Sequence, residues 1–196
     1  KFTTAAPHVL STSPAFASPL PAVFVVFTGA WVRWGDSSSV ADAIDADSAP
    51  AITQVFSTLF AFAALREDGS VVTWGSNNTG EDSSSVADEI DANSSPAVTQ
   101  VFSTNSAFAA LREDGSVVTW GGAGGDSSSV AEEIDANGTP AVTQVFSTGS
   151  AFAALRDDGS VVTWGVGRSG DSSSVAEEID AHRTPADKKD LTTSSP

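Results

Sequence analysis

The sequence predicts a mainly β protein built from tandem repeats, each forming a small antiparallel sheet, and two observations carry this prediction. The stretch Ala61–Gly75 returns unchanged at 107–121, and with one substitution, Asp157 in place of Glu, at 151–165. A second motif, Asp-Ser-Ser-Ser-Val-Ala, begins 46, 44 and 45 residues apart at Asp36, Asp82, Asp126 and Asp171. A period of this size is typical of propellers, solenoids and repeat arrays.

Each copy of the longer stretch predicts a β-hairpin. Two runs of apolar and β-branched residues flank an Asp-Gly pair such as Asp68-Gly69, and Gly adopts the positive φ of a tight turn without steric cost. Both faces of the hairpin are apolar, with Phe108 and Ala110 on one side and Ala109 and Leu111 on the other. A sheet buried on both faces must lie between two others, which neighbouring repeats provide.

The rest of the unit adds one more strand and a short helix. Residues 97–104 read as a strand, and the stretch that begins at Asp82 reads as a helix of two to three turns. Ser85, followed three residues later by Asp88, fits an N-cap, and Val86 and Ile90 share one helical face. We therefore expect a short helix or loop followed by three or four strands in each repeat.

The chain divides into an arm, a repeat domain and a tail. The arm, residues 1–20, is rich in Pro and reads as extended chain. The repeat domain, 21–186, is expected to hold four units, at about 21–46, 47–92, 93–136 and 137–186. The first unit is shortened to an apolar strand at 22–27 and a segment at 28–35 that resembles the end of the hairpin. Residues 187–196 read as a linker or disordered terminus.

Composition excludes several classes of protein. With 196 residues and 40% hydrophobic content the chain can bury one core, while a net charge of −16 argues against nucleic-acid binding. The absence of Cys removes disulfides and thiolate metal sites. No apolar run of about 18 residues predicts a membrane-spanning helix. The first residue is Lys1, which is typical of a processed product or a fragment.

The repeat resembles that of the regulator of chromosome condensation family. The resemblance lies in Ala-Leu-x-x-Asp-Gly-x-Val-x-x-Trp-Gly, followed later by Val-x-x-Val-Phe-Ser-Thr, and covers about residues 22–186. It implies that each repeat is one blade of a β-propeller, seven blades making a ring in that family. The combination with Asp-Ser-Ser-Ser-Val-Ala is most similar to a divergent form in large repetitive proteins of aquatic microbes, many of which look secreted or surface-attached.

Two departures from the family limit what the resemblance implies. About four units are present instead of seven, and an acidic, helix-like segment replaces the Gly-rich segment after Trp-Gly. No residues match those for nucleotide exchange on a small GTPase, so that activity is not carried over. Four units either close a small ring, with the incomplete first unit completing the last by strand exchange, or form an open, solenoid-like stack whose ends join other molecules.

No catalytic site is predicted. His8 and His182 are the only histidines, one in each terminal region, and no phosphate loop or nucleophile elbow occurs. The serine triplets recur four times, which favours a structural role. Trp74, Trp120 and Trp164 recur once per hairpin and favour packing over an aromatic binding ladder; the same holds for Trp31 and Trp34.

Two kinds of site are expected with less support. Carboxylates at matching repeat positions are weak candidates for Ca²⁺ binding, although a solvated acidic face is the favoured interpretation. They are Asp88, Glu89, Asp91, Glu132, Glu133 and Asp135, with Glu177, Glu178 and Asp180 in the last repeat. No other cofactor is expected. Three sequons make Asn77, Asn93 and Asn137 candidate glycan acceptors if the protein is secreted.

The favoured function is that of a non-enzymatic structural protein, extracellular or at the cell surface, which self-assembles into a filament, sheet or coat. Its partners are then copies of itself, joined through the repeat edges and a strand formed by Ala22, Val23, Phe24, Val25, Val26 and Phe27. The alternative is a propeller-type binding or scaffold module for a glycan or another surface protein.

Overall fold

The computed structural model describes residues 37–180 except 46, 48, 76–78, 92, 94 and 136–139, with only the backbone of 177 and 178. These residues belong to the second of the two units into which the chain divides, Val32–Pro196. The predicted arm, tail, assembly strand and strands of the first repeat lie outside the described residues.

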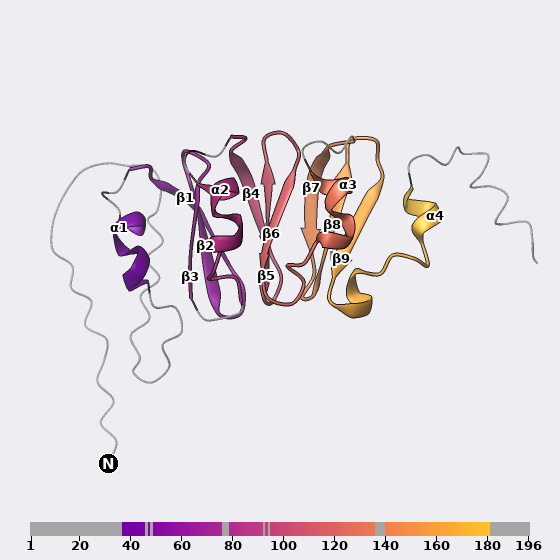
Figure 1. Cartoon of the computed structure of the whole chain (residues 1–196), viewed down its shortest axis with the longest axis horizontal. Coiled ribbons are helices and arrows are strands. Elements are labelled where there is room, and N and C mark those ends of the chain that lie inside the picture. Colours follow the sequence, from indigo (N-terminus) through magenta and orange to yellow (C-terminus); the bar gives the residue numbers. More distant parts are fainter. Residues whose placement is uncertain are drawn as a thin grey trace, which may run out of the picture. The chain divides into compact units, whose positions relative to one another are not determined.

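Within the described ranges, nine strands form three separate antiparallel sheets of three strands each, which we call the first, second and third blades (Figure 1). Consecutive blades lie side by side: β4 contacts β1 and β2 of the first blade, and β7 contacts β4 and β5 of the second. The strands are β1 (Ile52–Ser57), β2 (Ala61–Arg66), β3 (Val71–Gly75), β4 (Val98–Ser103), β5 (Ala107–Arg112), β6 (Val117–Gly121), β7 (Val142–Ser147), β8 (Ala151–Arg156) and β9 (Val161–Gly165). The predicted mainly β fold of blade-like repeats is confirmed.

The hairpin turn uses three residues, of which Gly supplies the positive φ. In the first blade the N–H of Arg66 donates to the carbonyl of Ser70 at 2.9 Å, and Gly69 adopts φ +80°. The carboxylate of Asp68 accepts the backbone N–H of Ser70 at 3.0 Å and its hydroxyl at 2.6 Å. The Asp-Gly-Ser sequence thus encodes the turn locally.

A helical segment precedes each blade, and we call it the wedge. The second wedge is a 3₁₀ turn, η2 (Ser84–Val86), followed by one α-helical turn, α2 (Ala87–Ile90). The others are η1 (Ser38–Val40) with α1 (Ala41–Ile44), η3 (Ser128–Val130) with α3 (Ala131–Ile134), and α4 (Ala176–Ile179) after η4 (Gly167–Gly170). In the first three wedges the 3₁₀ and α-helical turns are contiguous and match the lower end of the two to three turns predicted, whereas α4 is a single turn.

The predicted serine N-cap is wrong. Ser85 lies inside the 3₁₀ turn, and α2 begins without a side-chain cap. Instead, the carboxylate of Asp82 accepts the backbone N–H of Ser84 at 3.0 Å. Because this Asx turn starts the helical segment three residues before Ser85, the capping function passes to the preceding Asp.

The core consists of two clusters, each lying between consecutive blades. On β5, Phe108 and Ala110 belong to the cluster shared with the first blade, and Ala107, Ala109 and Leu111 to the one shared with the third. This is the two-sided burial that the hairpin pattern predicts. Among the described residues, no helix is long and apolar enough to cross a bilayer.

Candidate functional site: the interface between blades and its open ends

The interface between blades is built from two different faces. The leading face of a blade packs on the preceding blade, and its trailing face packs on the following one. In the second blade the leading face holds the large residues Val101, Phe108, Val118 and Trp120, all at most 6% exposed. Small residues, such as Ala61 and Ala63 of the first blade, lie opposite and admit them.

Phe108 and Trp120 form a stacked pair on this leading face, with ring centroids 5.4 Å apart. The Trp120 indole N–H donates to the carbonyl of Gly80, which lies before the second wedge, at 3.0 Å. Phe152 and Trp164 stack in the same way, also at 5.4 Å. Trp120 and Trp164 are each 2% exposed, so the packing interpretation of these two residues is confirmed.

The second wedge lies between β3, the last strand of the first blade, and β6, the last strand of the second blade, and contacts both. The hydroxyl of Thr73 on β3 donates to the carbonyl of Glu81 at 2.7 Å and lies 3.0 Å from the hydroxyl of Ser83, which ties the wedge to the blade before it. Ile90, 2% exposed, inserts into the core shared with the blade after it. Thr119 and Ile134 repeat these two roles at the next interface.

Backbone hydrogen bonds between blades run in both directions along the array. In the loops that follow the first strands, the N–H of Leu59 donates to Asn105 at 2.9 Å, and the N–H of Asn105 donates to Gly149 at 3.1 Å. In the opposite direction, the N–H of Val98 donates to the carbonyl of Gly69 at 3.2 Å, and the N–H of Val142 donates to that of Gly115 at 3.0 Å. Each blade therefore offers both a backbone donor and a backbone acceptor to its neighbour.

The leading face of the first blade is more exposed than its counterparts. Val55 is 45% exposed, whereas Val101 and Val145 at the same repeat position are 2% and 1% exposed. Phe62 and Trp74, which stack on each other at 5.4 Å, are likewise only partly buried. This face carries the same residues as the buried leading faces of the second and third blades.

The trailing face of the third blade is open as well. Phe146 is 51% exposed, while Phe102 at the same position packs against the second core cluster. Leu155 is partly exposed, and Leu111 is 6% exposed. Nothing lies within 4 Å of a Cβ placed on Gly159, whereas one on Gly115 would meet the Cβ of Ala141 at 2.7 Å.

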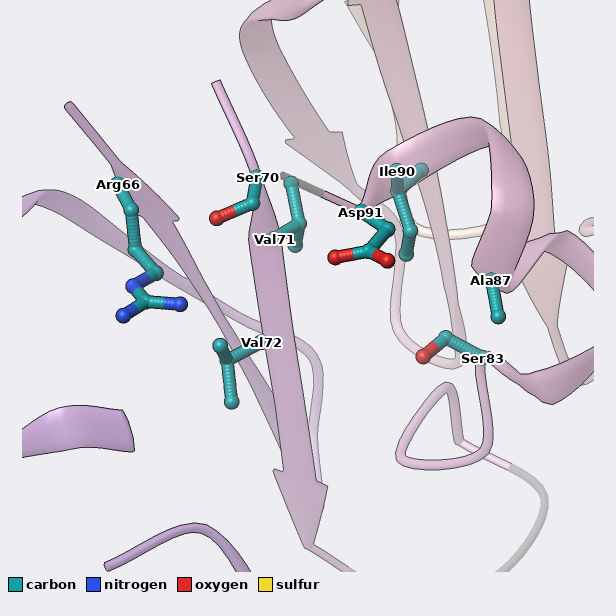
Figure 2. Close-up of a pocket in the computed structure, with 8 residues that line it drawn as sticks. All are labelled: Arg66, Ser70, Val71, Val72, Ser83, Ala87, Ile90 and Asp91. Carbon is teal, nitrogen blue, oxygen red and sulfur yellow. The ribbon is translucent and has the colours of Figure 1, made fainter. Parts of the chain in front are cut away.

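A cavity of about 210 Å³ lies beside β3 and α2 (Figure 2). In Figure 2 Arg66 lies on one side of β3, and Ile90 and Asp91 lie on the other. The remaining lining residues are Ser70, Val71, Val72, Ser83 and Ala87. The Arg66 Nε–H donates to the carbonyl of Pro50 at 3.2 Å, and the Ser70 hydroxyl donates to Asp68. Because these two polar groups are engaged in hydrogen bonds within the fold, we do not interpret the cavity as a binding site.

The predicted Ca²⁺ ligands lie on the wedges, with exposed side chains on residues 88, 89, 91, 132, 133 and 135. Among the described residues, no three carboxylates or histidines gather in a way that could hold a metal. Glu89 and Glu133 instead approach Arg112 and Arg156 of the following blade, each at 3.9 Å between Oε2 and Nη1. The Ca²⁺ site stays a prediction without a geometric counterpart.

The other predicted sites fall mostly outside the described residues. Asn93 is exposed in a turn before β4, as a glycan acceptor must be. Asn77 and Asn137, both histidines, Trp31, Trp34 and the strand 22–27 lie in the parts of the chain that are not described. Exposed stack ends and repeat edges were predicted as one alternative, but the residues of the two open faces were not named. The sequence contained evidence for them, because the first and last hairpins have two apolar faces like the central hairpin but a described neighbouring blade on one side only.

Comparison with known proteins finds similar solved structures. No family model matches the chain, and no curated protein sequence matches it. Similar solved structures include human WBSCR16 (23% identity, 58% of this chain and 34% of that chain, TM-score 0.40). Yeast RCC1 (Prp20) bound to Kap60 is 16% identical over 58% of this chain and 32% of that chain, with TM-score 0.40. Prp20p from Saccharomyces cerevisiae, described together with its binding properties to Gsp1p and histones, is 18% identical over 60% of this chain and 31% of that chain, with TM-score 0.42.

The chain thus spans about a third of the length of these structures. RCC1 belongs to the regulator of chromosome condensation family, so the resemblance drawn from the repeat motif is found among solved structures too. The likeness concerns the fold of the repeats and says nothing about activity.

Proposed function

We propose that this chain is a non-enzymatic structural subunit, secreted or held at a cell surface, which assembles with copies of itself end to end. The supporting observation is the interface between blades, built twice inside the chain from a leading and a trailing face. The first blade presents the same kind of leading face, and the third blade the same kind of trailing face, both partly open. The surface that best complements one end is therefore the other end of a second copy.

The polar groups at the two ends also match. Continued to the next copy, the backbone ladder would let the N–H of Gly149 donate to the carbonyl of Leu59. Gly149 has no side chain, which leaves room for Leu59, 62% exposed at the opposite end. A joint between two different faces is heterologous, so it propagates into a filament unless the rotation closes a ring.

The energy of such a joint is moderate. Fully burying a Phe or Val side chain contributes about 1.5–3 kcal/mol, and several of the side chains on the open faces are already half-buried. Association itself costs about 4–15 kcal/mol in lost freedom of motion. We therefore expect reversible assembly at micromolar concentrations, with growth in steps of one 19.9 kDa chain.

Two end variants test the proposal by sedimentation velocity. Phe146→Glu blocks the trailing face, and Val55→Glu blocks the leading face, because each places a charge in an interface that must become dry. Each variant alone is expected to be monomeric. Their equimolar mixture should form a dimer and nothing larger, since one intact trailing face then meets one intact leading face. Gln144→Glu, an exposed position beside the interface on the same strand, is the matched control and should assemble like the wild type.

A wild type that stays monomeric, or a mixture that fails to dimerise, contradicts the proposal. Loss of assembly on deletion of residues 1–27, with both face variants still assembling, would instead place the joint in the strand 22–27. Location outside the cell is supported by the acidic composition and by the exposed sequon at Asn93. A glycan on Asn93, sought by mass spectrometry of the natural protein, tests that part.

A binding or scaffold module is the second candidate, because the open apolar faces also suit the sheet face of a different protein. The sedimentation experiment separates the two functions. A chain that remains monomeric up to high concentration, yet carries these two open faces, favours a foreign partner. Stepwise growth favours copies of itself.

A further inference from the structure

Each of the first three wedges contacts the outer strand of the blade that follows it. η1 contacts β3, η2 contacts β6, and η3 contacts β9. The last helix, α4, has the same sequence as α3, Ala-Glu-Glu-Ile, but no described blade follows it. Val175 is accordingly 41% exposed, and Ile179 is only partly buried, whereas Ile134 is 3% exposed.

The sequence after α4 lacks the two valines that the first strands of the second and third blades carry. The first strand of a blade buries two valines, Val142 at 4% and Val145 at 1% exposure in the third blade. One repeat later the corresponding residues are Asp187 and Asp190. A buried, unpaired carboxylate is strongly unfavourable, so these two positions differ in chemistry from those at which the other first strands bury apolar side chains.

The first blade, conversely, has the poorest wedge. Ile44 of α1 is only partly buried, and α1 has no buried residue. The wedges before the second and third blades place Glu89 near Arg112 and Glu133 near Arg156. At that position α1 has Ala43, and the equivalent arginine of the first blade is Arg66. In α4 the same position is Glu178.

From these complementary features we propose that the joint between copies is helix-swapped: α4 of one copy takes, on β3 of the next copy, the place that α1 holds in the separate chain. The inference rests on the end-to-end assembly proposed above. One joint provides space for one wedge, while two are available, and α4 brings both the apolar face and the carboxylate that suit the first blade. Exchange of an identical element between copies is a low-cost route to association.

Cross-linking tests the swap directly, because the chain has no cysteine of its own. Arg66→Cys and Glu178→Cys chains are mixed in equal amounts under assembling conditions and treated with a short bismaleimide. We expect covalent dimers on a denaturing gel, and none when either variant is treated alone. The double variant Glu133→Cys/Arg156→Cys, which joins neighbouring positions within one chain, is the positive control for the reagent.

A second double variant reports the position of α1. In dilute monomer, Ala43→Cys/Arg66→Cys should cross-link within one chain, and this product should decline as assembly proceeds. If assemblies form while the 43–66 product persists and 66–178 dimers are missing, the swap is wrong and the end-to-end assembly stands. If no assemblies form, the proposed function itself fails.

A charge-reversal cycle tests the proposed pairing of Arg66 with Glu178 independently. Arg66→Glu and Glu178→Arg should each weaken association on the order of 2–5-fold, the range of an exposed ion pair. The two variants mixed with each other should recover that loss at the joint where the reversed charges meet. Glu177→Arg, the neighbouring helix position, is the matched control and should show no recovery with Arg66→Glu. If the mixture of Arg66→Glu and Glu178→Arg shows no recovery, the assigned ion pair is wrong.

Discussion

At the scale of single residues, the three repeats are near-identical in sequence, and their differences act as natural controls. The same side chain occurs at the same position with and without a neighbour. Trp120 donates its indole N–H to Gly80, whereas the buried Trp164 Nε1 has no hydrogen-bond partner among the described residues. The loop between Gly121 and Asp126 is two residues shorter than the one between Gly75 and Asp82, so the carbonyl that Trp120 uses is not reproduced for Trp164.

The turn glycines provide a matched pair for measuring stability. Gly115 and Gly159 adopt nearly the same φ, +81° and +84°. An Ala at either position pays about 1–2 kcal/mol for the left-handed backbone. At Gly115 the new methyl group also meets Ala141 and the carbonyl of Val142, at 2.7 and 3.0 Å, which adds overpacking of about 1–3 kcal/mol. In urea unfolding we expect Gly115→Ala to be the more destabilising variant; equal losses would contradict the packing assigned to this turn.

At the scale of elements, each hairpin turn carries a carboxylate whose ionisation is linked to folding. For Asp114 burial raises the pKa, but hydrogen bonds from the hydroxyl and the N–H of Ser116, together with the charge of Arg112, outweigh it and hold the pKa below the usual value. The pKa of Asp68 is lowered in the same way by Ser70 and Arg66 in the first blade. A lowered pKa stabilises the fold above the unfolded value near 3.8, and that contribution is lost as the pH falls through the folded value.

Acid unfolding should expose this linkage. Between pH 7 and pH 3 the wild type is expected to lose more stability than Asp114→Asn, because the variant has no carboxylate left to protonate. The difference should be below about 1 kcal/mol, since the turn is exposed to solvent. Glu113→Gln, the adjacent exposed carboxylate, is the control. The free energy of unfolding is measured by urea titration at the two pH values. An equal pH dependence of the wild type and Asp114→Asn would contradict the stabilising role of the ionised Asp114.

At the scale of the whole molecule, net charge opposes the assembly that the open faces favour. Each copy carries −16, so two copies repel each other, and one additional ion pair at the joint is a small correction. Salt shortens the Debye length from about 30 Å at 0.01 M to about 8 Å at 0.15 M. We therefore expect the association constant to rise several-fold over this range, measured by sedimentation. The monomeric Phe146→Glu variant should not respond, and assembly that weakens with salt would indicate a joint dominated by ion pairs instead of apolar contacts.

The sequence by itself determined the blade. Asp-Gly-Ser turns, alternating Phe and Ala, and Val86 and Ile90 four apart are local patterns, and local physics is enough to make hairpins and a short helix from them. Capping was not determined in this way, because Ser85 and Asp82 compete for it and the backbone geometry of the 3₁₀ turn favours Asp82.

Tertiary structure alone decided which surfaces are free. Val55, Val101 and Val145 are the same residue at the same repeat position, and only the packing around each blade makes one of them 45% exposed and the other two at most 2% exposed. Burial depends on neighbours that are distant in sequence, so no local pattern distinguishes a blade inside the array from one at its end.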